Sequence, residues 1–415
     1  MLRWLRWDPA LIVVYGLLVG IGLLTLYSIS HAEVARVPSL LWQKQLMWAA
    51  VAVFIGLFLW AARKLDLGIW AYPLYGLGMV LLVFTLLMGG EVAGAQAWLR
   101  MGGFNLQPSE LMKVFTALAL AHYLTTPGFE RRWNRALSVG ALLIIGLPVA
   151  LIFAQNDMGT ALMFGGLVLM LLRRGMPPAF ITIPMLIGMV FLLSIYFPAG
   201  SVMWAWTGLF LLVGWIMWRV AKWRGVGRAL LVWGAGMLII WSSGSVFERL
   251  KPHQQQRILV TIGKVSDPRG QGYNLQQSLI AIGSGGLSGK GYRNGSQTQY
   301  GFVPAQHTDF IFTAIAEEWG WMGAMSVLLL YAALLLRVLR LAERSHSEMV
   351  NLFGYGFVGV TGLHVLINLA SVMGLFPVVG VPLPYISYGG SALAAFSLFL
   401  FMFLAMEASA REAVL

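Results

Sequence analysis

One stretch of the sequence, from Gly270 to Glu318, is polar in a chain that is otherwise mostly apolar. It holds glycines, amides, hydroxyls and a few charges, and it enters an apolar segment at Asp309. Ionisable groups at or inside a membrane are costly to place there and are candidates for functional sites. Asp309 is therefore the first candidate for a catalytic group. The structural alternative is a helix N-cap, a position that suits Asp and that Thr308 would also fill.

A second candidate group is the pair Glu110 and Lys113. The two residues are three positions apart, so they share one face of a helix. In the structural interpretation they form an ion pair that neutralises both charges inside the membrane. In the functional interpretation they face a hydrated cavity, where Lys113 binds a phosphate and Glu110 binds a metal ion or Lys113. The two interpretations are compatible.

Two more charged residues stand at the starts of apolar runs. Lys44 opens the second run, where it either extends to the membrane interface or binds a lipid phosphate. Asp157 precedes a run that begins at Met158. It either caps that helix or directs its carboxylate into the same cavity as Glu110 and Lys113.

The glycine run at residues 283–291 is similar to a phosphate-binding loop but fails its pattern. Ser284 stands where that pattern needs Gly, and Gly291 stands where it needs Ser or Thr. What remains is a flexible backbone with free N–H groups and Lys290, which together are able to approach an anion closely. The remaining candidates for substrate binding are Ser278, Arg257 and Arg100. For Arg257 the alternative is a solvated loop charge.

Composition identifies the class of protein. The 415 residues are 59% hydrophobic and only 11% charged, which is typical of a polytopic membrane protein. The chain has no cysteine, so thiolate chemistry and disulfides are excluded. The net charge of +12 is spread in short clusters between apolar runs, so we expect no nucleic-acid partner.

Twelve apolar runs predict an all-α fold with about twelve transmembrane helices, most of them long enough to cross about 30 Å of hydrocarbon. We expect the first apolar run to be an uncleaved transmembrane helix rather than a signal peptide. The run at 158–173 is short. The predicted spans are 9–30, 41–61, 68–88, 108–126, 136–154, 158–173, 179–197, 203–219, 228–247, 309–336, 349–373 and 388–408.

Charge predicts the orientation of these spans. Clusters of Arg and Lys occupy alternate connections, for example around Arg63 and Arg131, and those connections are predicted to be cytoplasmic. Residues 1–415 then form a single integral membrane domain with both termini in the cytoplasm. One large extracytoplasmic loop covers 248–308. The segments that carry Glu110, Asp157 and Asp309 all fall on the outer side, so the sequence predicts one shared site there.

Several motifs carry a resemblance to a known family. They are AIGSGGLSGKG at 281–291, GSQTQ at 295–299, VPAQHTDFIF at 303–312, QPSE followed by Lys113, QNDMGTA at 155–161, and GVPLPYISYGGS at 380–391. Together they resemble the SEDS family of RodA and FtsW peptidoglycan glycosyltransferases, from about Lys44 to Ser391 and closer to RodA. Two departures are Asn156, where the family has Pro, and Ala305, where it usually has Glu.

The resemblance implies a pattern of ten spans, seven of them before the large loop. Nine precede it in this chain, so we expect an inserted pair of helices within 179–247. An added pair leaves the sidedness of all later segments unchanged.

The resemblance also implies a function. It is the polymerisation of lipid II into glycan strands at the outer face of the bacterial cytoplasmic membrane, for cell-wall elongation and cell shape. The alternative is a lipid II flippase. A transporter should show inverted repeats and polar groups at the bilayer midplane, whereas here the polar groups concentrate on one side.

The implied chemistry is an inverting transfer in which a sugar hydroxyl displaces polyprenyl pyrophosphate. Asp309 would be the base, and the cationic candidates would bind the phosphates. A single carboxylate fits a direct displacement better than the carboxylate pair of glycoside hydrolysis. Participation of a divalent cation, Mg²⁺ or Mn²⁺, is the alternative. No set of metal ligands can be identified in the sequence. The implied partners are a class B penicillin-binding protein, which is a transpeptidase, and other membrane proteins of the elongation complex.

Overall fold

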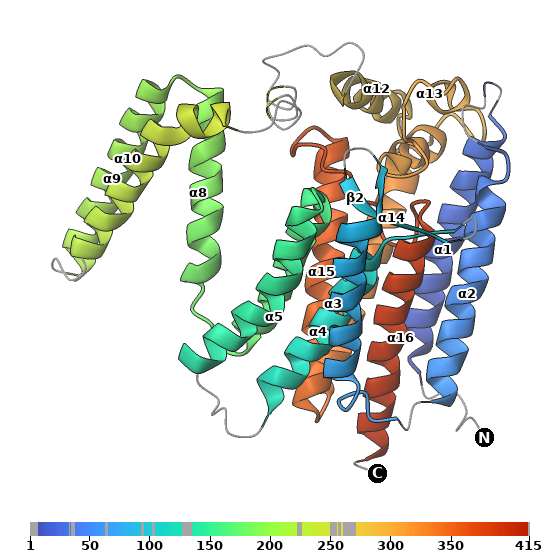
Figure 1. The fold of residues 1–415 in the computed structure, drawn as a ribbon. Helices are drawn as coiled ribbons and strands as arrows, with labels where there is room; N and C mark the ends of the chain where they lie inside the picture. Colours follow the sequence, from blue (N-terminus) through green and yellow to red (C-terminus); the bar gives the residue numbers. More distant parts are fainter. Residues whose placement is uncertain are drawn as a thin grey trace. The chain divides into compact units, whose positions relative to one another are not determined.

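The structure is a computed structural model that describes residues 7–32, 34, 38–62, 65–92, 95–101, 104–126, 135–221, 226–249, 255, 259 and 271–413. These residues are mostly helical (Figure 1). The chain divides into two compact units. The first combines Met1–Gly175 with Pro268–Leu415, and the second is Met176–Asp267.

Long apolar helices make up the first unit. They are α1 (Pro9–Ser30), α2 (Leu41–Ala61), α3 (Ala71–Met88), α4 (Pro108–Thr125), α5 (Arg135–Ala154), α14 (Ile311–Arg344), α15 (Glu348–Val372) and α16 (Gly390–Glu412). The segment from Met158 to Arg173 is α6 (Met158–Met163), the 3₁₀ helix η1 (Phe164–Leu167) and α7 (Val168–Arg173). Within the described residues, six helices of the chain are long and apolar enough to cross a membrane, namely α1, α2, α3, α14, α15 and α16. The predicted all-α membrane fold is therefore confirmed, while the count of twelve spans stays a prediction.

The short run at 158–173 is helical throughout, although η1 is wound more tightly than its neighbours. Gly166 in this stretch lies directly against Gly359 of α15. A Cβ atom on Gly166 would come within 2.4 Å of the Gly359 carbonyl carbon. Only glycine permits this approach of two backbones, and small residues serve the same purpose in membrane helix pairs generally.

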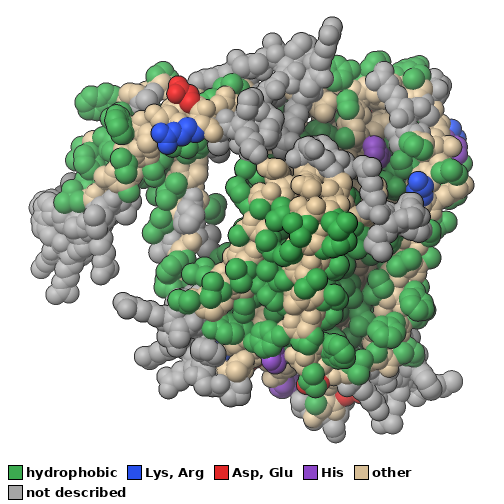
Figure 2. All heavy atoms as spheres, viewed as in Figure 1, with side chains coloured by type: hydrophobic (Ala, Val, Ile, Leu, Met, Phe, Trp, Pro, Cys, Tyr) green, Lys and Arg blue, Asp and Glu red, His purple; other side chains and the backbone are tan. Residues whose placement is uncertain are grey.

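The core of the first unit lies around α16 and α4. In the apolar window of α16, 89% of the residues are buried, against 22% in that of α3. The exposed residues of α2 and α3 are largely apolar, for example Phe54 and Leu87. Figure 2 shows hydrophobic side chains covering the middle of one face of this unit, with charged and histidine side chains toward its ends. This arrangement suits a helix bundle whose outer surface contacts lipid.

The chain alternates in direction through the first unit, so α4, α6, α14 and α16 all begin at the same end (Figure 1). Two short helices, α12 (Gln271–Ser284) and α13 (Ser296–Gln299), lie at that end as well. The polar motifs are thus collected at one end of the bundle, as the charge pattern predicts. That this end faces outward remains a prediction.

A small antiparallel sheet, which was not predicted from the sequence, precedes α4. Its strands are β1 (Gly90–Val92), β2 (Ala95–Met101) and β3 (Phe104–Leu106), in the order β1-β2-β3. Gln96 N donates to Gln155 O over 2.9 Å, which ties the sheet to the end of α5. The sheet therefore fixes the connection that leads into the QPSE motif.

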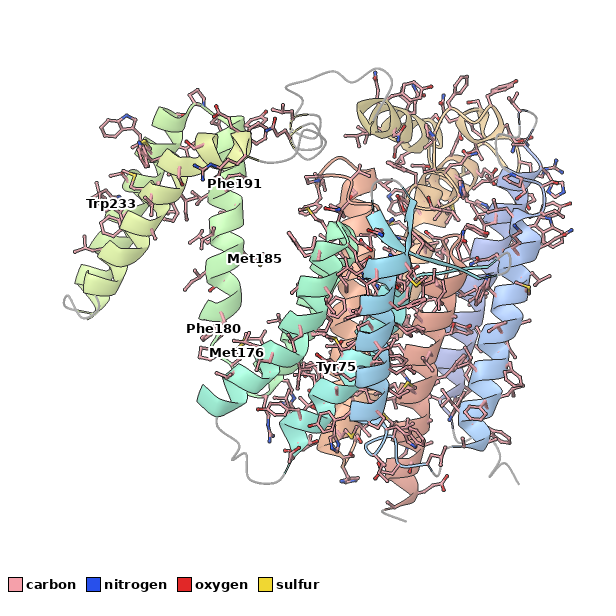
Figure 3. All side chains as sticks on the ribbon, in the orientation of Figure 1. Tyr75, Met176, Phe180, Met185, Phe191 and Trp233 are labelled. Carbon is pink, nitrogen blue, oxygen red and sulfur yellow. The ribbon has the colours of Figure 1, made fainter. Side chains whose placement is uncertain are left out.

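In the second unit the structure describes three long helices, α8 (Ala179–Tyr196), α9 (Ala199–Ala221) and α10 (Val226–Glu248). Val190, Val202 and Ile240 form its small core. Trp206 Nε1 donates to the carbonyl oxygen of Trp233 over 3.1 Å, which joins α9 to α10; Trp233 is labelled in Figure 3. The predicted inserted pair falls within this unit.

Candidate functional site

Asp309 lies in the turn that leads into α14. Thr308 N and Phe310 N both donate to Ala305 O, at 3.0 and 3.4 Å, and Ala305 has a φ of +52°. The N-cap of α14 is Phe310, so the alternative prediction that Asp309 is the cap is wrong. Asp309 is half-buried, and a Cβ atom on Gly380 would lie 3.7 Å from its Oδ2. The carboxylate therefore faces the loop between α15 and α16.

That loop, residues 373–389, is bonded to the same turn through Ser387. Ser387 Oγ donates to Thr308 O over 2.6 Å and accepts from Leu383 N over 2.8 Å. Tyr388 N donates to His307 O over 2.8 Å. The HTDF and PLPYISYGG motifs, which are about 80 positions apart in sequence, form one structure. Gly380, beside the Asp309 carboxylate, has a φ of +74°, a backbone conformation that favours glycine.

The rings of His307 and Tyr388 lie beside this turn, with their centroids 6.0 Å apart. Burial lowers the pKa of the His307 imidazole below its ordinary value. Burial also raises the pKa of the Tyr388 phenol. Burial therefore disfavours the charged form of each ring.

The side chain of Gln45 on α2 holds the SYGG turn from the other side. Gln45 Nε2 donates to Ser387 O over 3.1 Å, and Gly389 N donates to Gln45 Oε1 over 3.2 Å. The neighbouring candidate Lys44 is exposed at the same end of the bundle. This position is compatible with either of its predicted roles, extension to the interface or contact with a lipid phosphate.

Glu110 and Lys113 form the predicted ion pair at the start of α4. Lys113 Nζ lies 2.9 Å from both Glu110 Oε1 and Oε2, and the two residues are only 2% and 1% exposed. A third partner, His364 of α15, places its Nε2 2.7 Å from Lys113 Nζ. An ammonium has three N–H groups, so all of those on Lys113 have an acceptor. A phosphate would have to displace one of these partners.

Asp157 takes the first of its two predicted roles, the N-cap, while a carboxylate directed into a cavity shared with Glu110 and Lys113 stays a prediction. Its Oδ1 accepts from Thr160 N over 3.0 Å, which makes it the N-cap of α6. Its Oδ2 accepts from Gln107 Nε2 over 2.8 Å, and this bond joins the QND segment to the QPSE segment. Asp157 is half-buried at the same end of the bundle.

Comparison with known proteins decides the family. A family model described as "Cell cycle protein", FtsW/RodA/SpoVE, matches residues 9–223 and 201–412. The chain belongs to the FtsW/RodA/SpoVE family. The two matched segments overlap at 201–223, within the region where the inserted pair is predicted.

Named relatives and solved structures of the family agree with this assignment. Peptidoglycan glycosyltransferase RodA of Treponema pallidum (strain Nichols) is 31% identical over 93% of this chain and 94% of the relative. Peptidoglycan glycosyltransferase MrdB of Escherichia coli (strain K12) is 34% identical over 78% of this chain and 74% of the relative.

Two solved structures cover nearly the whole chain. A structure described as "Structural coordination of polymerization and crosslinking by a peptidoglycan synthase complex" matches with a TM-score of 0.68 and 30% identity, over 97% of this chain and 98% of the other. The rod shape determining protein RodA of Thermus thermophilus matches with a TM-score of 0.60 and 28% identity, over 98% of this chain and 99% of the other.

The glycine-rich segment of this family member has a structural use. Lys290 N and Gly291 N donate to the carbonyl oxygens of Glu317 and Glu318, both over 3.0 Å, and Gly289 N donates to Gly285 O over 2.9 Å. The prediction of free N–H groups for an anion is therefore wrong for these amides. The loop packs on the start of α14.

Lys290 is engaged in the same loop. Its Nζ lies 2.8 Å from Glu317 Oε1 and 2.8 Å from Ser296 Oγ. Glu317 is fully buried and also accepts from Gln297 N and Thr298 N, each over 2.9 Å. Such multiple bonding stabilises a buried carboxylate. Lys290 thus neutralises Glu317, and binding of a phosphate by Lys290 stays a prediction.

Of the last three predicted residues, the structure describes Ser278 and the backbone of Arg100. Ser278 is buried in α12, and its Oγ donates to Val372 O over 2.9 Å, which joins α12 to the end of α15. Arg100 lies in β2, opposite Asn105 of β3. Arg257 lies outside the described residues. The described residues contain no group of three or more His, Cys, Asp and Glu side chains that could hold a metal ion.

Two site residues were missed as such by sequence reasoning, His364 and Asn368. They stand four positions apart on α15, and both are buried. Asn368 Nδ2 donates to Asp309 O over 2.8 Å and to Val381 O over 2.7 Å. The available signal was a polar pair with helical spacing inside a long apolar helix.

Proposed function

We propose that this protein is a peptidoglycan glycosyltransferase that polymerises lipid II at the outer face of the bacterial cytoplasmic membrane, for cell-wall elongation and cell shape. Its relatives are named peptidoglycan glycosyltransferases, and they cover most of the chain. The observation that carries the proposal is the convergence of the family motifs on Asp309. The turn of Asp309 is bonded to the SYGG loop and to α15, and its carboxylate faces Gly380.

In the proposed reaction Asp309 is the general base. It takes the proton from the sugar hydroxyl of the acceptor as that oxygen forms a bond to the anomeric carbon of the donor. The bond from the anomeric carbon to the pyrophosphate oxygen breaks, and the pyrophosphate leaves with the electron pair. Such a displacement inverts the anomeric carbon. A positioned base contributes about 10²–10⁴-fold to a rate of this kind.

The leaving pyrophosphate needs positive charge more than it needs an acid. Lys113 and Lys290 are each paired with a buried glutamate. Lys44, Arg100 and Arg257 are the remaining proposed contacts. A divalent cation, Mg²⁺ or Mn²⁺, that bridges the pyrophosphate and a carboxylate stays part of the proposal without an assigned step.

The membrane setting and the partner complete the proposal. The chain is a multi-pass membrane protein, and we place it in the cytoplasmic membrane with both termini in the cytoplasm. A related solved structure is described as coordinating polymerization and crosslinking in a synthase complex. We therefore propose a class B penicillin-binding protein as the partner, together with other membrane proteins of the elongation complex.

The test is polymerisation of lipid II by the purified protein in liposomes, with and without that partner. A β-lactam in all samples blocks crosslinking, so that only glycan strands accumulate. We expect strands that a muramidase degrades. Transport of lipid II across the bilayer without strand formation would instead identify a flippase.

A further inference from the structure

The helix α15 presents two buried polar side chains, one turn apart, to the elements that carry the site. His364 is 1% exposed and Asn368 is 2% exposed. His364 contacts α4 through Lys113 and contacts the 373–389 loop through Pro382. Asn368 contacts that loop through Val381 and contacts the turn before α14 through Asp309. Burying polar side chains in a membrane helix costs free energy, so such residues are candidates for functional sites.

The orientation of the Asn368 amide follows from its neighbours. Both nearby groups are carbonyl oxygens, at 2.8 Å on Asp309 and 2.7 Å on Val381. Only the NH₂ end of an amide donates, so Nδ2 must face them and both of its hydrogens are used. Asn368 Oδ1 is left buried with no partner among the described residues. The Nδ2 group of Asn368 thus holds two backbone segments together, while its Oδ1 atom has no hydrogen bond among the described residues.

The tautomer of His364 follows in the same way. His364 Nδ1 lies 3.3 Å from Pro382 O, which only accepts, so Nδ1 carries the proton. His364 Nε2 is then the acceptor for Lys113 Nζ at 2.7 Å. His364 can bridge Lys113 and Pro382 only in this form. The imidazole is also fixed by an edge contact with the ring of Phe396, at 4.8 Å between centroids.

These contacts form a continuous path from the ion pair to the proposed base. It runs from Glu110 and Lys113 through His364 to Pro382, and then through Val381 and Asn368 to the backbone of Asp309. Apart from the peptide bond between Val381 and Pro382, each link is a hydrogen bond of 3.3 Å or less between buried or half-buried groups. The path joins four parts of the fold, namely α4, α15, the 373–389 loop and the turn before α14.

We propose that Asn368 and His364 are positioning residues for Asp309, and that Lys113 acts on the reaction through His364. This inference rests on the proposed function, since it assumes that Asp309 is the base. Asn368 fixes the peptide of Asp309 relative to the loop that its carboxylate faces. His364 fixes that same loop relative to the Glu110–Lys113 pair. A displacement of about 1 Å at a reacting group costs about 10²-fold in rate, so loss of either link lowers turnover.

The first experiment compares Asn368→Ala with Ser371→Ala in lipid II polymerisation by the purified complex. Ser371 is a matched control, because it lies on the same helix, is buried, and donates to Pro377 O of the same loop over 3.1 Å. We expect Asn368→Ala to lower kcat by about 10–100-fold with little change in KM. Ser371→Ala should change kcat by less than about threefold. Equal effects of the two substitutions overturn the proposal.

The second experiment tests whether Asn368 acts through Asp309. In an Asp309→Asn background the base is absent, so Asn368→Ala should cause no further loss of the residual rate. A further loss of about tenfold or more would show that Asn368 acts on something else. Should Asn368→Ala not assemble in the membrane, Asn368→Gln gives the same test, because it keeps the amide and carries it one methylene away.

The third experiment concerns His364. His364→Gln retains a donor for Pro382 and an acceptor for Lys113, whereas His364→Leu retains neither. We expect His364→Leu to lose about 10–100-fold in kcat and His364→Gln to recover at least half of that loss on a logarithmic scale. Full activity of His364→Leu would refute the path. An inactive wild-type protein would instead refute the proposed function, so the two failures are distinguishable.

Discussion

The buried pair Glu110–Lys113 offers a test that separates a structural role from direct contact with substrate. Lys113→Met removes the ammonium but nearly preserves the length of the side chain. Glu110 then keeps a carboxylate that is 2% exposed, and the hydrogen bonds of 2.9 Å that it received from Lys113 are lost. Removing one partner of a buried ion pair destabilises a protein by about 3–5 kcal/mol, because it leaves an uncompensated charge.

The double variant Glu110→Gln/Lys113→Met removes both charges. Replacement of a whole buried pair by uncharged side chains of similar volume is often neutral, so most of the lost stability should return. The matched exposed pair is Arg173–Glu343, whose side chains are 44% and 41% exposed. Glu343→Gln should cost about 0–1 kcal/mol, as is usual for surface pairs.

The assay is thermal unfolding of each variant in nanodiscs, followed by lipid II polymerisation with the amount of folded protein held equal. If the pair is structural and acts through His364, the double variant regains stability but keeps a reduced kcat, with KM close to wild type. If Lys113 binds phosphate directly, the double variant is stable and its KM rises. A Lys113→Met protein as stable as wild type would refute the reasoning about the buried charge.

Three further predictions follow from the fold. Gly289→Ala should lower the unfolding temperature, because Gly289 has a φ of +81° and a Cβ atom there would lie 2.1 Å from a backbone carbonyl of α14. The control Gly283→Ala should leave the unfolding temperature unchanged, because a Cβ atom at Gly283 has no neighbouring atom within 4 Å. Since the chain has no cysteine, a Cys placed at Leu287 should react with an impermeant thiol reagent in intact cells and one at Glu348 should not; the opposite labelling would reverse the topology. A reporter fused at Arg224, between α9 and α10, should indicate the cytoplasm if the inserted pair crosses the membrane, and an outside signal would exclude that insertion.

Much of the fold was predictable because the membrane constrains it. Runs of apolar residues long enough to cross the bilayer gave helix bounds within a few residues, for example 9–30 for Pro9–Ser30 and 388–408 for Gly390–Glu412. The prediction was poorer for α14, which reaches Arg344 and contains a break at Gly320, where φ is +64°. That break depends on the glycine-rich loop packed against it, which is a tertiary contact rather than a local preference.

The sheet and the two-unit division were not predictable from the sequence. Strands as short as Gly90–Val92 and Phe104–Leu106 show no alternation long enough to detect. The short strands β1 and β3 form because each pairs with β2, which lies between them in the sequence and in the sheet. The compactness of residues 176–267 as a separate unit depends on packing among α8, α9 and α10.

The charged residues of the candidate site could be predicted, because a charge in an apolar segment costs free energy. The uncharged polar residues that contact them could not. Charges in apolar surroundings pointed to Asp309, Glu110 and Lys113. The partners of these residues could not be inferred, since Asn368 and His364 on α15 are distant in sequence and chemically common. The same limit explains Lys290, whose pairing with the buried Glu317 required the folded loop.

The central claim, that Asp309 is the base of a glycosyl transfer, is tested most directly by Asp309→Asn. Asparagine keeps the size of the side chain and removes the basic oxygen. The measurement is formation of glycan strands from lipid II by folded Asp309→Asn protein bound to its partner. The account predicts a fall of about 10²-fold or more, with membrane insertion and partner binding unchanged. Polymerisation near the wild-type rate would contradict it.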